Sequence, residues 1–213
     1  MNEERRITEL KERLAQSIRI CVREELAEVL QHLHERLDRV TANDFIEVTE
    51  YGKPIRENTE PPKEVLLHTA IYRQRKDVNG IVYSHPLYST VLGILGRQIL
   101  PLLANCHFIK SGIRVFDVPQ YIGNSQTAEL MINELGSSVA LLLRGSGLVT
   151  VAENIQEATL LSILIERSAK VQYMASAIGD PKAIVAADMP GKFGSMPTHF
   201  FESSWDHYVS TAS

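Results

Sequence analysis

Apolar residues recur along the chain at two different spacings. Spacings of three and four predict amphipathic helices, and short runs rich in β-branched residues predict strands. A long helix is predicted over residues 3–30, a short one over residues 125–135, and a further helix over residues 155–178. The predicted strands are residues 45–48, 81–85, 113–118, 139–143 and 148–151. Helices and strands alternate, so we predict an α/β protein.

Residues 64–86 carry the clearest succession of elements. A helical stripe after Glu64 precedes the turn signals Lys76-Asp77 and Asn79-Gly80, and a strand then runs to His85 before Pro86. The apolar stripe of this helix consists of Val65, Leu66, Leu67, Ile71 and Tyr72. Residues two apart on a strand point to the same side. We therefore expect Tyr83 and His85 to face one pocket together.

Local signals mark where several other elements begin and end. Asn154 followed by Glu157 predicts a helix N-cap, and Gly136 predicts a helix end. A hairpin turn near Gly52 is expected to join residues 45–48 to a short returning strand. Residues 183–213 are expected to form a loosely packed tail, whose Trp205 docks on the core or on a neighbouring subunit. We treat residues 1–213 as a single domain.

Composition and charge narrow the range of functions. The 213 residues include 22 basic and 26 acidic ones, well mixed, giving a formal net charge of −4. This balance predicts neither a nucleic-acid partner nor a membrane partner. Two cysteines are too few for a disulfide framework or a zinc cluster. The acidic, helical start at residues 1–14 is unlike a signal peptide, so we expect a cytoplasmic protein.

Three sequence words resemble those of the class II aldolase/adducin family. The family has E-x-x-x-H on a helix, then Y-x-x-R-x-D-V, then H-x-H-P at a strand end. This chain has Glu64 to His68, then residues 72–78, then Tyr83-Ser84-His85-Pro86. The resemblance implies a three-layer α/β/α sandwich with a largely antiparallel central sheet flanked by helices. It also implies a homo-oligomer, typically a tetramer with pockets at subunit boundaries.

The chain departs from the family at the residues that hold its metal. In the family three histidines bind a divalent metal that acts as a Lewis acid, and the residue equivalent to Glu64 ligates it or moves a proton. Two of the three histidine positions are here Tyr83 and Ser146, and only His85 remains. A phenol and a serine hydroxyl are poor replacements near neutral pH. We predict no metal cofactor, with zinc or manganese bound through His85, Glu64 and His32 or His34 as the alternative.

Two further segments bear on the substrate. Residues 31–36 resemble the family's pocket strand, in which His32 and Arg36 fit the pattern and His34 replaces a serine. These side chains either line the pocket, ligate a metal or remain solvated on an edge strand. Pro61 and Pro62 stand where the sugar-phosphate aldolases of the family have serines that hold phosphate. Prolines offer neither a hydroxyl nor an N–H, so the resemblance is nearer the branch acting on small carboxylates, including decarboxylases.

Three functions follow from this resemblance. The first is a metal-independent, lyase-like enzyme acting on a small oxo- or hydroxy-carboxylate by decarboxylation, retro-aldol cleavage, dehydration or cyclisation. Glu64, His85 and Tyr83 would transfer protons, while His32, Arg36 and Ser146 would bind the substrate. The second is a catalytically inactive relative that serves as a binding or assembly module. The third is a metal-dependent lyase with a rebuilt ligand set.

Overall fold

The computed structural model describes residue 41 and residues 45–109, 112–185 and 198–212. The helix predicted over residues 3–30 and the strand predicted near residues 31–36 lie outside the described residues. The helices are α2 (Val65–Gln74), α3 (Leu87–Ile94), α4 (Ser125–Leu135), α5 (Ile155–Ser176), α6 (Thr198–Ala212) and the 3-10 helix η3 (Ala104–Ile109). The strands are β1 (Gly80–Ser84), β2 (Val115–Phe116), β3 (Ala140–Leu143) and β4 (Gly147–Ala152).

The four strands form one sheet in the order β1-β4-β3-β2. β4 pairs antiparallel with both β1 and β3, whereas β2 pairs parallel with β3. The sheet is therefore mixed, with antiparallel pairs in the majority, as the predicted largely antiparallel sheet required. Ser84, the last residue of β1, pairs with Leu148 near the start of β4. This register brings the end of β1 beside the β3–β4 turn.

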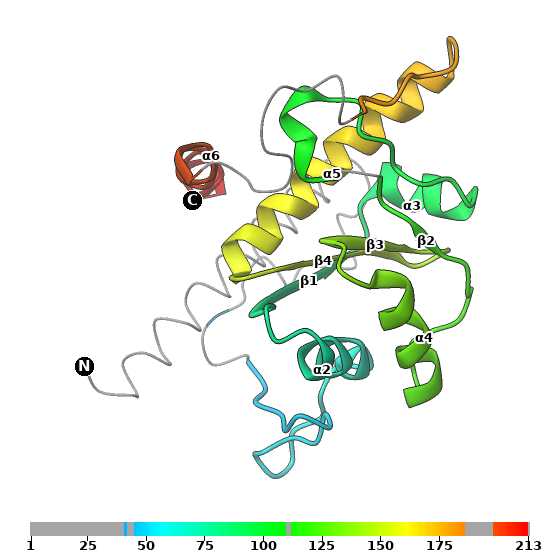
Figure 1. Cartoon of the computed structure of the whole chain (residues 1–213). Helices are drawn as coiled ribbons and strands as arrows, with labels where there is room; N and C mark the ends of the chain where they lie inside the picture. Colours follow the sequence, from blue (N-terminus) through cyan, green and yellow to red (C-terminus); the bar gives the residue numbers. More distant parts are fainter. Residues whose placement is uncertain (1–40, 42–44, 110–111, 186–197, 213) are drawn as a thin grey trace.

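Helices cover both faces of the sheet and produce three layers (Figure 1). Alternate residues of β3 belong to two different cores, one on each face of the sheet, because successive strand side chains point to opposite faces. Leu141 and Leu143 pack with α2 and α4, whereas Ala140 and Leu142 pack with α3, η3 and α5. The predicted α/β/α sandwich is thus confirmed.

Side-chain caps explain where two of the helices begin. Asn154 accepts a hydrogen bond from the Glu157 backbone N–H at 2.8 Å, so the predicted cap of α5 is confirmed. Asn124 accepts one from the Thr127 N–H at 2.9 Å and begins α4. Gly136 ends α4 with a positive φ of 53°, which a glycine adopts without a Cβ clash.

Four local predictions were wrong or incomplete. The strand predicted over residues 113–118 is reduced to β2, and the hairpin at residues 45–55 has one isolated bridge between Val48 and Pro54. The predicted loose tail contains α6, whose Phe200 packs on the α5 core while Trp205 is half-buried. Tyr72 was expected in the apolar stripe of α2, yet it is 41% exposed. Burial on α2 instead falls on Leu67, Thr69, Ala70 and Ile71.

None of the helices in the described residues combines the length and the hydrophobicity that crossing a bilayer requires.

Candidate active site

A small cavity lies where the start of α2, the end of β1, the β3–β4 turn and the β2–α4 loop meet. Its volume is about 10 Å³, which is close to the space of one water molecule. Its walls combine polar groups with an apolar floor. The lining residues are Glu64, Leu67, Tyr83, Gln120, Tyr121, Ile122, Leu143 and Ser146. Three residues predicted for the site, Glu64, Tyr83 and Ser146, are therefore brought together by the fold.

Glu64 is placed by the beginning of α2. It is the residue directly before the helix, and its backbone carbonyl accepts hydrogen bonds from the N–H groups of Leu67 and His68. Its half-buried side chain lines the cavity together with Tyr121. Burial, the Glu64 charge and hydrogen bonding to the Glu64 carboxylate raise the pKa of Tyr121 to about 12. Tyr121 is thus a neutral hydrogen-bond donor at any physiological pH.

Tyr83 and Ser146 form the second polar pair of the cavity. The Tyr83 hydroxyl and Ser146 Oγ share a hydrogen bond at 2.5 Å, and either atom can be the donor. Burial raises the pKa of Tyr83, the Ser146 hydrogen bond lowers it, and the nearby Glu64 charge raises it further, so the net shift is upward. Tyr83 therefore keeps its proton at neutral pH and can donate it to an oxygen in the cavity.

The turn that carries Ser146 depends on its glycines. Gly145 has a φ of +71°, and a Cβ on Gly147 would overlap the backbone carbonyl oxygen of Ser84. Glycine at 147 therefore allows β4 to approach the end of β1 closely. Arg144, at the start of the turn, forms an ion pair with Asp117. This ion pair ties the Ser146 turn to the β2–α4 loop that carries Tyr121.

His85 lies beside the cavity, not among its lining residues. Its exposed ring packs edge-on against Tyr83, with 4.8 Å between ring centroids. Tyr83 and His85 are therefore neighbours, as the strand spacing suggested, but only Tyr83 reaches the cavity. His68, one helical turn after Glu64, has a pKa lowered to about 4 by burial, against the opposing effect of the Glu64 charge. It is neutral at pH 7.

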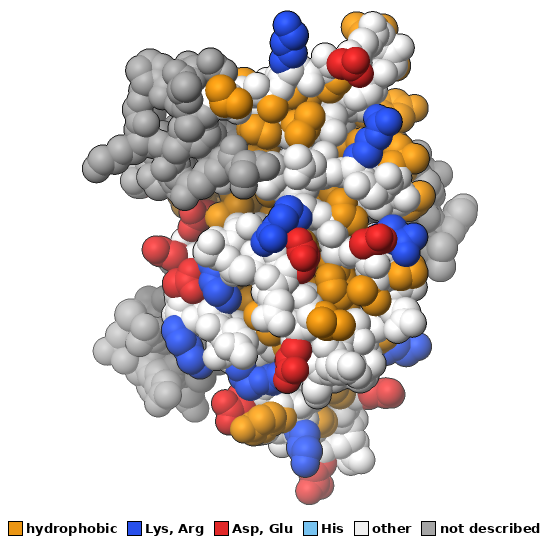
Figure 2. All heavy atoms as spheres, turned by 45° about the vertical axis from the view of Figure 1, so that its right-hand side comes forward, with side chains coloured by type: hydrophobic (Ala, Val, Ile, Leu, Met, Phe, Trp, Pro, Cys, Tyr) orange, Lys and Arg blue, Asp and Glu red, His pale blue; other side chains and the backbone are white. Residues whose placement is uncertain are grey.

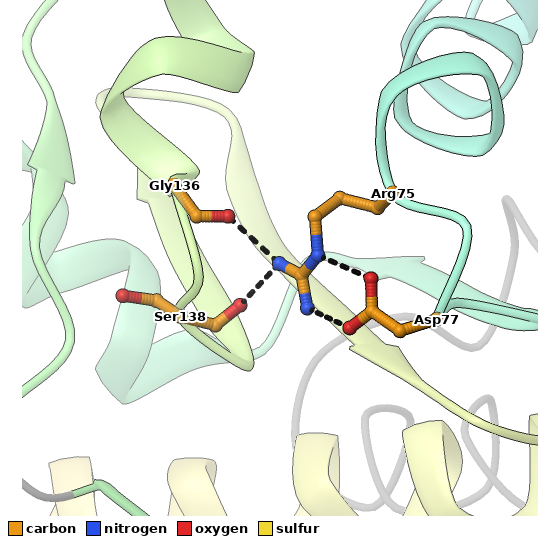
Figure 3. A network of polar contacts seen from close by, with 4 residues as sticks. All are labelled: Arg75, Asp77, Gly136 and Ser138. Carbon is orange, nitrogen blue, oxygen red and sulfur yellow. Dashed lines mark hydrogen bonds and ion pairs between the residues drawn. The ribbon is translucent and has the colours of Figure 1, made fainter.

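Arg75 and Asp77 belong to one of the sequence words that resemble the family, and their contacts stabilise the fold (Figure 3). Arg75 donates to both carboxylate oxygens of Asp77, at 2.9 and 2.7 Å. It also donates to the carbonyl oxygens of Gly136 and Ser138, at 2.8 and 3.2 Å. The hydrogen bonds from Arg75 lower the pKa of Asp77 to about 2. This network joins the α2–β1 turn to the α4–β3 turn.

The charge pattern of the molecular surface bears on the kind of partner the protein can bind. On the face drawn in Figure 2, basic and acidic side chains are interspersed with apolar ones and neither sign gathers into a continuous patch. That face therefore shows no charged patch that would suggest a nucleic-acid or membrane partner.

The residues around the cavity do not fit the metal site that the sequence resemblance implies. Two of the three places held by histidine in that pattern are the hydroxyls of Tyr83 and Ser146, which bond to each other. Over the described ranges, no three His, Cys, Asp or Glu side chains come together in a way that could hold an ion. The absence of a metal cofactor remains a prediction, because His32 and His34 lie outside those ranges, as does Arg36.

Sequence reasoning missed Gln120 and Tyr121. They follow the predicted strand end at Pro119, and no periodicity or motif assigned them a role. A tyrosine just before the Gly123-Asn124 helix start is a weak local signal. Only the packing of the β2–α4 loop against α2 brings the Tyr121 hydroxyl to Glu64.

Known proteins resemble this chain over most of its length. The family model for the class II aldolase and adducin N-terminal domain matches residues 17–173. A 3,4-dihydroxyphthalate decarboxylase from Arthrobacter keyseri is 29% identical over 71% of this chain and 64% of its own length. A 5-deoxy-D-ribulose 1-phosphate aldolase from Bacillus thuringiensis is 28% identical over 65% of this chain and 64% of its own length. The matches thus span less than two thirds of these relatives.

Solved structures show the same fold. An L-fuculose 1-phosphate aldolase from Glaciozyma antarctica superposes with a TM-score of 0.80, covering 98% of this chain and 90% of that chain at 21% identity. Another L-fuculose 1-phosphate aldolase gives a TM-score of 0.74, covering 94% of this chain and 96% of that chain at 18% identity. At these identities the likeness concerns the fold alone.

Proposed function

Because the chain belongs to the class II aldolase and adducin N-terminal domain family, we propose that it is a metal-independent lyase acting on a small oxo- or hydroxy-carboxylate. The curated relatives include decarboxylases and aldolases, both of which cleave carbon–carbon bonds. One observation carries the proposal: a carboxylate and hydroxyl donors share a cavity where the family pattern would place a metal. Glu64, Tyr83 and Ser146 are the residues concerned.

The geometry supports acid–base chemistry. A lyase must stabilise the negative charge that develops on a substrate oxygen when the bond breaks. Tyr83 is a protonated donor paired with Ser146, so it supplies a hydrogen bond to such an oxygen. Glu64 is a half-buried acceptor that lines the same cavity. Exposed His85 packs on Tyr83 and provides a route for protons to and from solvent.

In a decarboxylation, the bond between the substrate carbon and its carboxyl carbon breaks and CO2 leaves. The electron pair moves onto a conjugated oxygen, which Tyr83 stabilises. One proton, taken from water through His85 and Glu64, then replaces the carboxyl group on carbon. We assign the distal substrate carboxylate to His32 or Arg36. In a retro-aldol cleavage the same donors would stabilise the enolate.

The decisive experiment is a turnover assay with protein treated with a chelator. The first test compound is 3,4-dihydroxyphthalate, the substrate class named for the Arthrobacter keyseri relative. Released CO2 is measured with and without added zinc or manganese. We expect turnover without metal, and a loss of about 10²- to 10⁴-fold for Glu64→Gln and for Tyr83→Phe. Tyr173→Phe, on the opposite face of the sheet, is the matched control.

Substrates with a phosphate provide a second comparison. Pro61 and Pro62 precede Glu64, and neither side chain offers a hydrogen-bond donor. We expect 5-deoxy-D-ribulose 1-phosphate to be a poor substrate. Activity that requires zinc or manganese and disappears in His85→Ala would contradict the metal-independent proposal and favour the metal-dependent alternative.

A catalytically inactive binding or assembly module is the second candidate. The volume of about 10 Å³ favours it, because an aromatic acid does not fit unless side chains move. If the chain is such a module, wild-type protein and Glu64→Gln will both fail to turn over every acid tested. In that case, capture of a specific partner protein would be insensitive to Glu64→Gln and Tyr83→Phe.

The assembly and the location of the protein are part of the same proposal. The family resemblance implies a homotetramer, and we expect light scattering to give four times the chain mass of 23.9 kDa. We propose that the protein acts in the cytoplasm. A monomer in solution would contradict the proposed tetramer, and no second subunit would then contribute residues to the cavity.

A further inference from the structure

We propose that the Glu64 cavity receives the uncharged hydroxyl end of a small ligand, and that Tyr121 occupies this place in the free protein. This inference rests on the proposed function and names which end of a hydroxy-carboxylate enters the cavity. It assigns Tyr121 the role of an internal substitute for the ligand, which must move aside when the ligand binds. The ligand's carboxylate stays outside the cavity.

The charges around the cavity determine which end enters. Glu64 is the acidic group of the lining, and its neighbours are the neutral side chains of Tyr83, Ser146, Gln120 and Tyr121. Neither lysine nor arginine is among the lining residues of the described chain. A ligand carboxylate placed there would meet a like charge without a cation to offset it. An uncharged hydroxyl instead donates to Glu64 and accepts from Tyr83 or Ser146.

Tyr121 lines the same cavity as Glu64, and its phenol is the kind of group that a phenolic or enolic ligand would bring to the Glu64 carboxylate. Leu67, Ile122 and Leu143 provide an apolar floor suited to a ring or a short carbon chain. The remaining volume of about 10 Å³ is too small for such a ligand while Tyr121 is in place.

The Tyr121 side chain can rotate out of the cavity without disrupting the hydrophobic core. Its side chain is 44% exposed, and the loop that carries it is fixed on both sides. The Asp117–Arg144 ion pair holds the loop before Tyr121, and the Asn124 cap of α4 holds it afterwards. Rotation of one side chain toward solvent therefore opens the cavity, while the positions of Glu64, Tyr83 and Ser146 are kept.

Two matched probes test the proposal without any need for turnover. Catechol carries two uncharged hydroxyls on a benzene ring, and benzoate carries a carboxylate on the same ring. Their dissociation constants are measured by ligand-observed NMR with the full chain. We expect wild-type protein to bind catechol in preference to benzoate. Tyr121→Phe removes the competing hydroxyl and should bind catechol about tenfold more tightly.

Glu64→Gln should weaken catechol binding by about tenfold and reduce the discrimination against benzoate. Tyr173→Phe is the matched control, because Tyr173 is 48% exposed on α5 and packs beside Tyr88, across the sheet from the cavity. It should leave both constants unchanged. Thermal melts of the variants confirm that each one is folded.

The proposal is overturned if catechol binds neither wild-type protein nor Tyr121→Phe, if benzoate binds as tightly as catechol, or if Tyr121→Phe does not strengthen catechol binding. The turnover assay fails separately. Selective catechol binding without turnover would refute the proposed reaction and keep this inference. Metal-free turnover with no effect of Tyr121→Phe on binding would do the reverse.

Discussion

Two adjacent residues of β1 make hydroxyl–hydroxyl hydrogen bonds on opposite faces of the sheet. Ser84 bonds to Ser162 of α5 at 2.9 Å, with both side chains buried in the layer between the sheet and α5. Tyr83 bonds to Ser146 at 2.5 Å, half-buried at the wall of the cavity. The chemistry of the pairs is similar, but only the second pair has space and a carboxylate beside it.

This comparison shows why one hydroxyl pair only stabilises the fold, whereas the other can also bind a ligand. On the α5 face, every neighbour of the Ser84–Ser162 pair belongs to a packed layer, so its hydrogen bond can only contribute to stability. On the α2 face, the β2–α4 loop packs on the core through buried Ile122, whereas Tyr121 is 44% exposed and lines the cavity. The Tyr83–Ser146 pair can exchange its partner for a ligand oxygen, at a small cost in folding free energy.

The largest effect is expected at Gly147, which follows Ser146 in the chain and lies against the backbone of Ser84. A Cβ in Gly147→Ala would overlap the Ser84 carbonyl oxygen and force β1 away from β4. We expect a loss of about 3 kcal/mol or more in the free energy of unfolding, measured by urea denaturation. Gly145→Ala is the control in the same turn. Its positive φ costs only about 1 kcal/mol, because nothing lies within 4 Å of the added Cβ.

The second effect concerns His68, a half-buried histidine of α2 that is neutral at pH 7. Its folded pKa of about 4 lies below the unfolded value of 6.5, so the unfolded chain binds more protons between these values. The stabilisation is therefore complete above pH 6.5 and is lost as pH falls toward 4. The loss should approach about 3 kcal/mol.

His68→Leu should flatten this part of the stability-against-pH curve, measured by chemical denaturation at pH 7 and pH 5. His207, on the exposed side of α6, provides the control. His207→Gln should leave the slope unchanged. A slope that survives in His68→Leu would show that another group is responsible.

The third effect compares the two hydroxyl pairs directly. Ser84→Ala leaves the buried Ser162 hydroxyl without its Ser84 partner and should cost about 1–2 kcal/mol in the free energy of unfolding. Ser146→Ala should cost less than about 1 kcal/mol, because Tyr83 can turn to water. Catechol binding should show the opposite order, with Ser146→Ala the more affected. Equal effects on both measurements would remove the distinction between the two faces.

The smallest effect belongs to the Arg75–Asp77 network. Asp77→Asn removes a bidentate partner of Arg75, but the carboxylate is 64% exposed, so we expect a loss of only about 1 kcal/mol at pH 7. The folded pKa of about 2 lies below the usual value of 3.8, so this contribution is present above pH 4 and fades as pH falls toward 2. Urea denaturation across that range tests it, and Asp77→Asn should show the weaker dependence.

Much of the fold could be predicted because its signals are local. The Asn154 cap predicted the start of α5, and the continuous apolar run at residues 139–143 predicted a buried strand. The predicted loose tail missed α6, whose contact with the rest of the fold depends on Phe200 packing on the α5 core. The shortening of the strand at residues 113–118 has a similar cause, because β2 extends only as far as its pairing with β3.

The candidate site divides in the same way. The sequence resemblance singled out Glu64, Tyr83, His85 and Ser146 as candidates, because each stands in a short word with fixed spacing on one element. Tertiary structure alone decided that Tyr83 bonds to Ser146, that His85 stays outside the cavity, and that Tyr121 reaches Glu64. Those contacts join segments far apart in the chain, and they depend on strand register and loop packing, which no local pattern of residues encodes.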